Sequence, residues 1–136
     1  MLSPKEIVNK MYTNDDYSKW LGISFIDVGL GFCRIKMEVR QEMTNGFDVA
    51  HGGVTFAFAD SAFAFASNSL GRHAVSIETS ISHTRPVFKG DTLIAHASQK
   101  NISNTLAIFE VTVTNQNEKV VALFKGTVYR KENIWT

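Results

Sequence analysis

The sequence predicts an α+β fold in which an antiparallel sheet wraps around one long helix. Residues 52–70 form an alanine-rich apolar run of helical length, and its hydrophobic residues surround the helix axis, so every side must be covered. Five or six strand-like segments joined by short polar turns supply the sheet, and such short links favour antiparallel pairing. The 136 residues fit a single domain over residues 1–136.

The chain opens with helical signals. Within residues 3–6, Ser3 suits a helix N-cap, proline follows at the first helical position, and Glu6 completes a capping box. A second short helix is expected from about Asn14 to Gly22. The residues that this second helix is expected to bury are Tyr17, Trp20 and Leu21.

From Ile23 onward the hydrophobic period changes to two. Between residues 33 and 40, apolar residues alternate with charged ones, which is typical of a strand with one buried face. Cys33 lies on the apolar side of this pattern and is the only cysteine, so a buried thiol is expected and an intramolecular disulfide is excluded. The predicted strands cover residues 23–28, 33–40, 74–84, 92–99, 106–115 and 119–131.

The composition disfavours several classes of protein. A net charge of +1 argues against a nucleic-acid surface. Residues 1–6 lack the apolar run of a signal peptide, so a cytoplasmic location is the default expectation. A membrane helix over residues 52–70 is disfavoured because Asp60 and the polar residues 67–69 interrupt the run. No metal site is expected, since the histidines have no ligand spacing.

Asp60 is the only charged residue between His51 and Arg72. On a buried helix a carboxylate loses hydration worth several kcal/mol unless it finds partners. Two interpretations follow: a structural carboxylate that is satisfied by neighbouring donors, or a catalytic base or nucleophile whose pKa is set by burial.

The start of the same helix is also unusual. It reads His51-Gly52-Gly53, with no Ser, Thr, Asp or Asn directly before it as a cap. Its first N–H groups are therefore expected to be open, and the glycines allow close approach to the backbone. Such a helix end can bind a developing oxyanion. The alternative is that the glycines only serve a tight turn.

Spacing connects the two features. Asp60 follows Gly52 by eight residues, or about 12 Å along a helix, so one substrate carbon could hardly contact both. If both groups serve one reaction, they come from two chains, and the sequence then predicts a homodimer with shared active sites. Small residues that would permit close packing are Ala57, Ala59, Ala62, Ala64 and Ala66.

The order of these motifs resembles that of the phenylacetic acid degradation thioesterases, which are hotdog-fold enzymes. The resemblance spans about Met11 to Arg130. The matching residues are Asn45, His51-Gly52-Gly53, residues 59–64, Ala66-Ser67-Asn68, Arg85-Pro86, residues 90–93 and residues 121–126.

The resemblance implies a thioester hydrolase that acts on acyl-CoA, with aryl or medium-chain acyl groups such as phenylacetyl. It implies that Asp60 is the nucleophile or the general base and that the Gly52 N–H polarises the thioester carbonyl. Asn45 and His51 match residues that position the carbonyl or the water. The family also implies a homodimer and often a homotetramer. Coenzyme A is part of the substrate, and no separate cofactor is expected.

Further residues are expected to contact substrate. Gly53 lies at the helix end, Ser76 falls where related thioesterases place a supporting hydroxyl, and Phe63 offers aromatic surface beside Asp60. Arg85 is a candidate for the phosphates of coenzyme A. The other basic candidates are Arg72, Lys89, Lys100, Arg130 and Lys131.

Several of these residues have structural alternatives. His51 could simply cap the helix, and Asn45 followed by glycine is a common turn pair. The aromatic residues of the helix could be plain core. At the level of function, the alternatives are a non-catalytic hotdog domain that binds acyl-CoA and a hydratase, although the histidine–carboxylate motifs of hydratases are absent.

Overall fold

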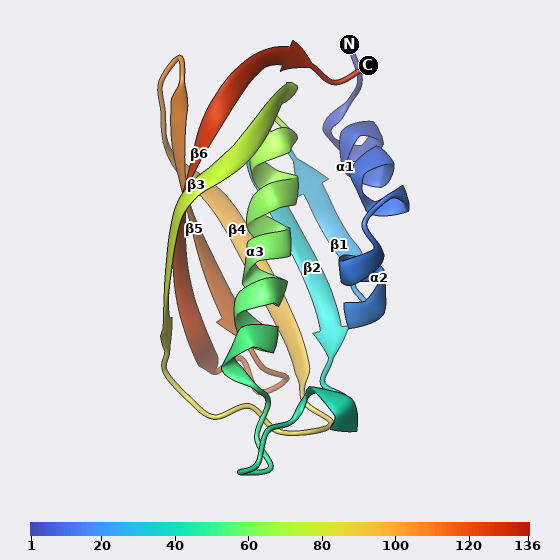
Figure 1. Ribbon diagram of the computed structural model, residues 1–136, viewed down its shortest axis with the longest axis vertical. Coiled ribbons are helices and arrows are strands. Elements are labelled where there is room, and N and C mark those ends of the chain that lie inside the picture. The colour runs from blue at the N-terminus through green and yellow to red at the C-terminus, as the bar shows by residue number, and fades with distance from the viewer.

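One antiparallel sheet of six strands forms the body of the protein, with strand order β1-β2-β4-β5-β6-β3. The structure is a computed structural model that describes residues 1–136. The sheet curves around α3 (Gly52–Asn68), as Figure 1 shows. The strands are β1 (Ser24–Gly29), β2 (Phe32–Glu38), β3 (Arg72–His83), β4 (Thr92–Ile102), β5 (Leu106–Thr114) and β6 (Val120–Ile134).

The core lies between α3 and the sheet. Alternate residues of the middle strands are buried, as in the run from Ala107 to Val113 of β5, and they meet apolar residues of the helix. Each fully buried phenylalanine contributes on the order of 1.5–3 kcal/mol. The predicted α+β arrangement of a sheet around a long helix is confirmed. Cys33 is buried as expected, and the loss of hydration raises the pKa of its thiol to about 12.

Two N-terminal helices pack beside α3, and they are α1 (Pro4–Thr13) and α2 (Asp16–Leu21). The capping box between Ser3 and Glu6 is present. The expected burial of Tyr17 and Trp20 is wrong, because these side chains are 53% and 47% exposed. The short helix α2 buries only Ser18 and Leu21. The two aromatic rings pack on each other instead, on its outer side.

The edge strand β3 begins earlier than expected and contains an irregularity. Its pairing register with β6 shifts between Ser76 and Glu78. An inserted residue changes which side chains face the core, because side chains alternate along a strand. Ala74 therefore faces the core before the bulge and Ile81 faces it afterwards. Beside the bulge, Val75 and Ile77 are exposed at the open edge of the sheet.

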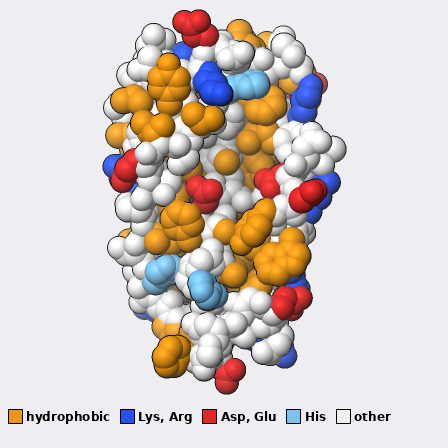
Figure 2. All heavy atoms as spheres, viewed as in Figure 1, with side chains coloured by type: hydrophobic (Ala, Val, Ile, Leu, Met, Phe, Trp, Pro, Cys, Tyr) orange, Lys and Arg blue, Asp and Glu red, His pale blue; other side chains and the backbone are white.

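The sheet of one chain does not cover α3 completely, in contrast to the expectation from its all-round apolar surface. Figure 2 views the molecule from the side of α3, and most of the charged side chains in view lie around the rim of this face. We call the incompletely buried side of the helix the open stripe, and its residues recur at helical spacing. They are Gly53, Phe56, Ala57, Asp60, Ser61 and Ala64.

Candidate active site

Asp60 lies in the middle of the open stripe. Its side chain is half-buried, and its carboxylate accepts no hydrogen bond from any group of the chain. Loss of hydration raises the pKa of the Asp60 carboxyl above its ordinary value, with no neighbouring cation to oppose the shift. The structural interpretation of Asp60 required satisfying partners within the fold. The chain provides none, so the carboxylate is available to a ligand.

A chain of hydroxyl groups holds the helix beside Asp60. The Ser61 hydroxyl lies 2.9 Å from the Ser18 hydroxyl, and the Ser18 hydroxyl donates to Asp15 at 2.6 Å. Asp15 is also the N-cap of α2, because it accepts the Ser18 N–H. These contacts join α2 to α3 at the level of the carboxylate. The sequence pattern gave no indication of them.

The first turn of α3 has one capped and one open N–H group. His51 is the N-cap, and its Nδ1 atom accepts the Gly53 N–H at 2.9 Å. The acceptor role places any imidazole proton of a neutral His51 on Nε2. The Gly52 N–H donates no hydrogen bond within the chain. Of the several N–H groups expected to be open, the Gly52 N–H is the one without a partner, because the Gly53 N–H donates to His51.

A cleft of about 290 Å³ opens at this end of α3. Gly52 lies on one wall and the segment after β3 on the other, so the open N–H and Arg85 share one cavity. One guanidinium nitrogen of Arg85 donates to the Val120 carbonyl at 3.0 Å. The cleft is lined by Val49, Ala50, Gly52, Thr55, His83, Thr84, Arg85, Pro86 and Val87.

His83 also lines this cleft, although its sequence position did not identify it as a site residue. It is the last residue of β3 and lies two residues after Ile81, on the core side of the strand. A Cβ atom on Gly52 would lie 3.4 Å from His83 Nε2. Without the bulge near Ile77, strict alternation from Ala74 would place His83 on the other face of the sheet. The sequence carried no signal for that bulge.

The predicted substrate-contacting residues divide between the site and the core. Ser76 follows Ala74 on the core side of β3, is exposed and makes no side-chain hydrogen bond. Phe63 is only 1% exposed, and a Cβ on Gly126 would meet its ring at 2.6 Å. Gly126 and the sheet enclose the ring within this chain, and the contact of Phe63 with substrate stays a prediction. Phe56 is the aromatic residue on the open stripe.

Asn45 lies in the loop before α3 and has a turn role. Its side-chain oxygen accepts the Phe47 N–H at 2.9 Å, and its backbone N–H donates to Val49. The side-chain amide nitrogen makes no hydrogen bond within the chain, and it is the part of Asn45 that a ligand can use. The turn interpretation of the Asn45-Gly46 pair is thus supported by the loop geometry.

Three of the basic candidates have partners within the chain. Arg72 donates to the backbone carbonyls of Asn104, Arg130 and Lys131, and Arg130 donates to Ser103. Lys100 lies 4.0 Å from Glu110 on the outer face of the sheet. Arg85 in the cleft and Lys89 in the following exposed turn have no acidic partner.

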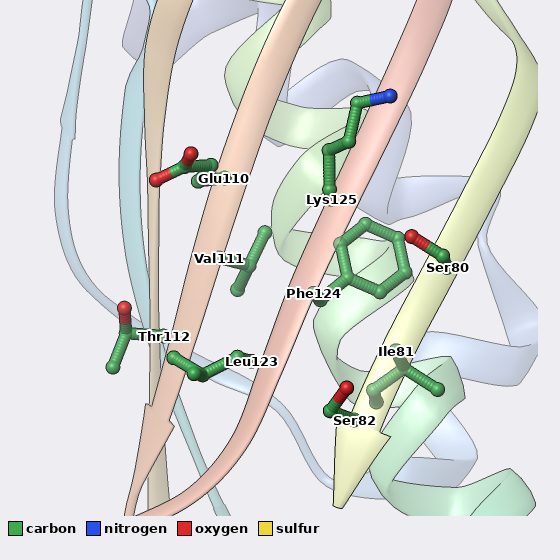
Figure 3. Close-up of a pocket in the computed structure, with 9 residues that line it drawn as sticks. All are labelled: Ser80, Ile81, Ser82, Glu110, Val111, Thr112, Leu123, Phe124 and Lys125. Carbon is green, nitrogen blue, oxygen red and sulfur yellow. The ribbon is translucent and has the colours of Figure 1, made fainter.

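A second hollow of about 360 Å³ lies on the outer face of the sheet (Figure 3). Its polar side chains come from β3, β5 and β6 and alternate with core-facing residues such as Val111 and Phe124. It is larger than the cleft at Gly52 but does not contain Asp60. Its outward-facing residues are Ser80, Ser82, Glu110, Thr112, Leu123 and Lys125.

The model of the thioesterase superfamily matches residues 47–122, a segment that includes the start of α3, Asp60 and the cleft. The chain therefore belongs to the thioesterase superfamily, and its fold is the hotdog fold. It is 42% identical to the acyl-coenzyme A thioesterase PaaI of Escherichia coli over 120 residues. This alignment covers 88% of this chain and 86% of the relative. It is 38% identical over 126 residues to a putative esterase of Archaeoglobus fulgidus, with 93% and 82% covered.

Solved structures give the same result. The PaaI protein from the phenylacetic acid degradation operon of E. coli superposes with a TM-score of 0.95 at 38% identity, over 98% of this chain and 96% of that one. A Streptococcus mutans protein bound to acetyl-CoA superposes with a TM-score of 0.81 at 27% identity, over 83% and 91%. The predicted family, a thioester hydrolase family of the PaaI type, is confirmed.

Two further observations concern metal binding and membrane spans. No three His, Cys, Asp or Glu side chains of the chain lie close enough together to bind a metal ion. The helices of the protein are all too short or too polar to cross a bilayer.

Proposed function

We propose that this protein is an acyl-CoA thioesterase whose active sites lie between two copies of the chain. The observation that carries the proposal is the pair of unpartnered groups on α3: the Asp60 carboxylate on the open stripe and the Gly52 N–H in the cleft. They lie eight residues apart on one continuous helix, about 12 Å along its axis. A second helix that runs antiparallel beside the first would bring each group opposite its counterpart.

The symmetry of such a dimer follows from these positions. An isologous pair places Gly52 of one chain opposite Asp60 of the other when the two-fold axis passes near residue 56, midway between them. Phe56 and Ala57 lie there on the open stripe, and the small side chain of Ala57 allows the helices to approach. The free edge of β3, with exposed Val75 and Ile77, supplies the matching strand interface.

The chemistry uses the two groups in turn. The thioester carbonyl oxygen accepts the Gly52 N–H at the positive end of α3, which makes its carbon more electrophilic. The facing Asp60 then attacks that carbon directly or removes a proton from an attacking water, and the thiolate of coenzyme A leaves. Burial that raises the Asp60 pKa makes the carboxylate a stronger base than an exposed aspartate.

The remaining site residues take supporting roles in this proposal. His51 Nε2 and the Asn45 amide are placed before α3, where they can orient the carbonyl or the water. Ser76 precedes the bulge of β3, on the strand that runs antiparallel beside α3, and so lies away from the Gly52 end. Arg85 and Lys89 are the basic side chains best placed for the phosphates of coenzyme A.

We further propose aryl or medium-chain acyl groups, with phenylacetyl-type thioesters favoured by the similarity to PaaI. Phe56 offers an aromatic wall near the two-fold axis. A homotetramer would form by packing of the outer sheet faces, where Glu110 and Lys125 lie opposite each other on neighbouring strands. A cytoplasmic location agrees with the single buried cysteine.

The test is a thiol-release assay on a panel of aryl, short-chain and long-chain acyl-CoA substrates, with Asp60→Asn as the control variant. We expect phenylacetyl-type thioesters to rank high and kcat of the variant to fall about 10²–10⁴-fold with its oligomeric state unchanged. Tight binding of acyl-CoA by the native protein without thiol release would indicate a non-catalytic binding domain instead. Near-native turnover of every substrate by Asp60→Asn would refute the role of Asp60.

A further inference from the structure

The bulge of β3 places His83 in the cleft, where the chain gives its side chain no partner. Its Nε2 and Cε1 atoms would lie 3.4 and 3.6 Å from a Cβ atom on Gly52. The side chain is exposed and takes part in no hydrogen bond of the chain. His51, the other histidine at this end of α3, has its Nδ1 committed to the Gly53 N–H. His83 is thus an unengaged imidazole beside the open Gly52 N–H.

The distances allow both groups to reach one atom. Standard geometry places a Cβ about 2.5 Å from its own amide nitrogen, so the Gly52 nitrogen and His83 Nε2 are at most about 6 Å apart. A hydrogen bond from nitrogen to oxygen spans about 2.9 Å. A single oxygen atom midway between the two nitrogens would therefore lie within hydrogen-bond distance of each.

We propose that His83 is a second donor to the carbonyl oxygen of the thioester, alongside the Gly52 N–H. This inference rests on the proposed thioesterase site. In the tautomer with its proton on Nε2, His83 donates to the oxygen while Asp60 or its water forms the new bond to the carbonyl carbon. The oxygen gains negative charge as the C=O π bond opens and returns it when the C–S bond breaks, and no proton leaves His83. Donors aimed at this charge strengthen most in the transition state.

Electrostatics of the cleft support this role. Arg85 is the only lining side chain with a permanent charge, and the N-terminus of α3 contributes a positive partial charge. No carboxylate lines the cleft to repel the oxyanion from the same chain. The carboxylate of the reaction arrives from the facing subunit, on the far side of the carbonyl carbon.

Three variants of His83 test the proposal by thiol release from the best acyl-CoA of the panel. His83→Phe keeps a ring and removes the donor, His83→Ala removes both, and His83→Gln places an amide N–H near the position of Nε2. We expect kcat of the first two variants to fall about 10- to 100-fold, with KM held within about threefold. We expect kcat of His83→Gln to be about tenfold higher than kcat of these two variants. His83 is exposed at a strand end, so native oligomers are expected throughout.

The proposal is overturned if kcat of both donor-free variants stays within twofold of the native value. It is also overturned if KM rises while kcat holds, since that result places His83 on a remote part of the substrate. A loss of kcat in His83→Ala with near-native kcat in His83→Phe would assign a packing role to the ring instead, and a loss in His83→Gln equal to that in His83→Phe would also count against the donor role. In all of these cases the native enzyme still hydrolyses acyl-CoA, whereas absence of native turnover would refute the proposed function itself.

Discussion

At the C-terminal end of α3 the buried polar side chains all have hydrogen-bond partners, whereas the N-terminal half carries an open backbone N–H and a carboxylate that have none. Asn68 contacts the carbonyl of Ala64, both backbone groups of Ala74 and the indole of Trp135. Ser69 bonds to Ala66 and accepts the Gly31 N–H. In contrast, the Gly52 N–H and the Asp60 carboxylate make no hydrogen bond within the chain.

Within α3, the C-terminal end thus serves stability and the N-terminal half serves function. A buried polar group without a partner costs about 1–3 kcal/mol, so folds normally satisfy such groups. The C-terminal end follows that rule and anchors the turn into β3. In the N-terminal half the Gly52 residue is exposed and the Asp60 carboxylate is half-buried, so both groups lie where a second chain and a substrate can supply partners.

Besides the loss of turnover expected for Asp60→Asn, the largest effect in this comparison is expected when the N–H of Gly52 is removed. Gly52→Pro removes that donor and keeps the start of the helix, because proline suits the first helical position and His51 already has the extended backbone (ψ 134°) that a following proline requires. We expect kcat to fall about 10²–10³-fold with the thermal midpoint nearly unchanged.

Gly52→Ala is the matched control, because it adds a Cβ but keeps the N–H. Its turnover is expected to remain within about fivefold of the native value, with a small loss from contact with His83. Equal losses in the two variants would mean that space at Gly52, and not its hydrogen bond, limits the reaction.

At the C-terminal end of α3 we expect substitutions to lower stability and to leave kcat per folded molecule unchanged. Asn68→Ala leaves the backbone of Ala74 and the Trp135 indole without partners, so the free energy of unfolding should fall by about 2–4 kcal/mol. Ser67→Ala removes a single bond to Ala64 and should cost about 0.5–1.5 kcal/mol. Denaturant titration at fixed protein concentration measures both effects. A fall in kcat per folded molecule would contradict the division between the two ends.

A smaller effect is expected on stability from Asp60→Asn. The pKa of Asp60 is raised in the folded state, so ionisation of this group destabilises the fold at neutral pH and protonation relieves the cost. The variant should therefore unfold on the order of 1–3 °C above the native protein at pH 7. The gap should begin to close as the pH falls below the raised pKa of the folded state, and it should vanish below the ordinary pKa of an aspartate, where the carboxyl is protonated in both the folded and the unfolded chain. A lower midpoint at pH 7 would indicate a stabilising partner for the carboxylate.

Much of this arrangement could be predicted from the sequence, for physical reasons. The apolar run and its lone charge identified both α3 and Asp60, and the missing Ser, Thr, Asp or Asn cap pointed to the open Gly52 N–H. Local patterns could not show that His51 would cap Gly53 through its ring. They could not separate Phe56 from Phe63 either, since seven residues return to nearly the same helix face and only the sheet decides which ring is covered.

The bulge near Ile77 set another limit. Strict alternation along β3 predicts one face for all odd residues, but the inserted residue changes the face partway along the strand. The position of His83 beside Gly52 in the cleft depends on that change. It joins segments 31 residues apart in the chain, and no local pattern encodes it. The open stripe of α3 was also hidden, because an all-round apolar helix gives no sign of which side a second chain covers.

Mixing two inactive variants tests the shared site most directly. Asp60→Asn supplies an intact Gly52, Gly52→Pro supplies an intact Asp60, and a mixed dimer contains one complete site. After equal mixing and full subunit exchange, verified by native mass spectrometry, about half of the dimers are mixed and turnover should recover to about a quarter of the native value. Turnover that stays at the level of the parent variants despite complete exchange would contradict an active site built from two chains.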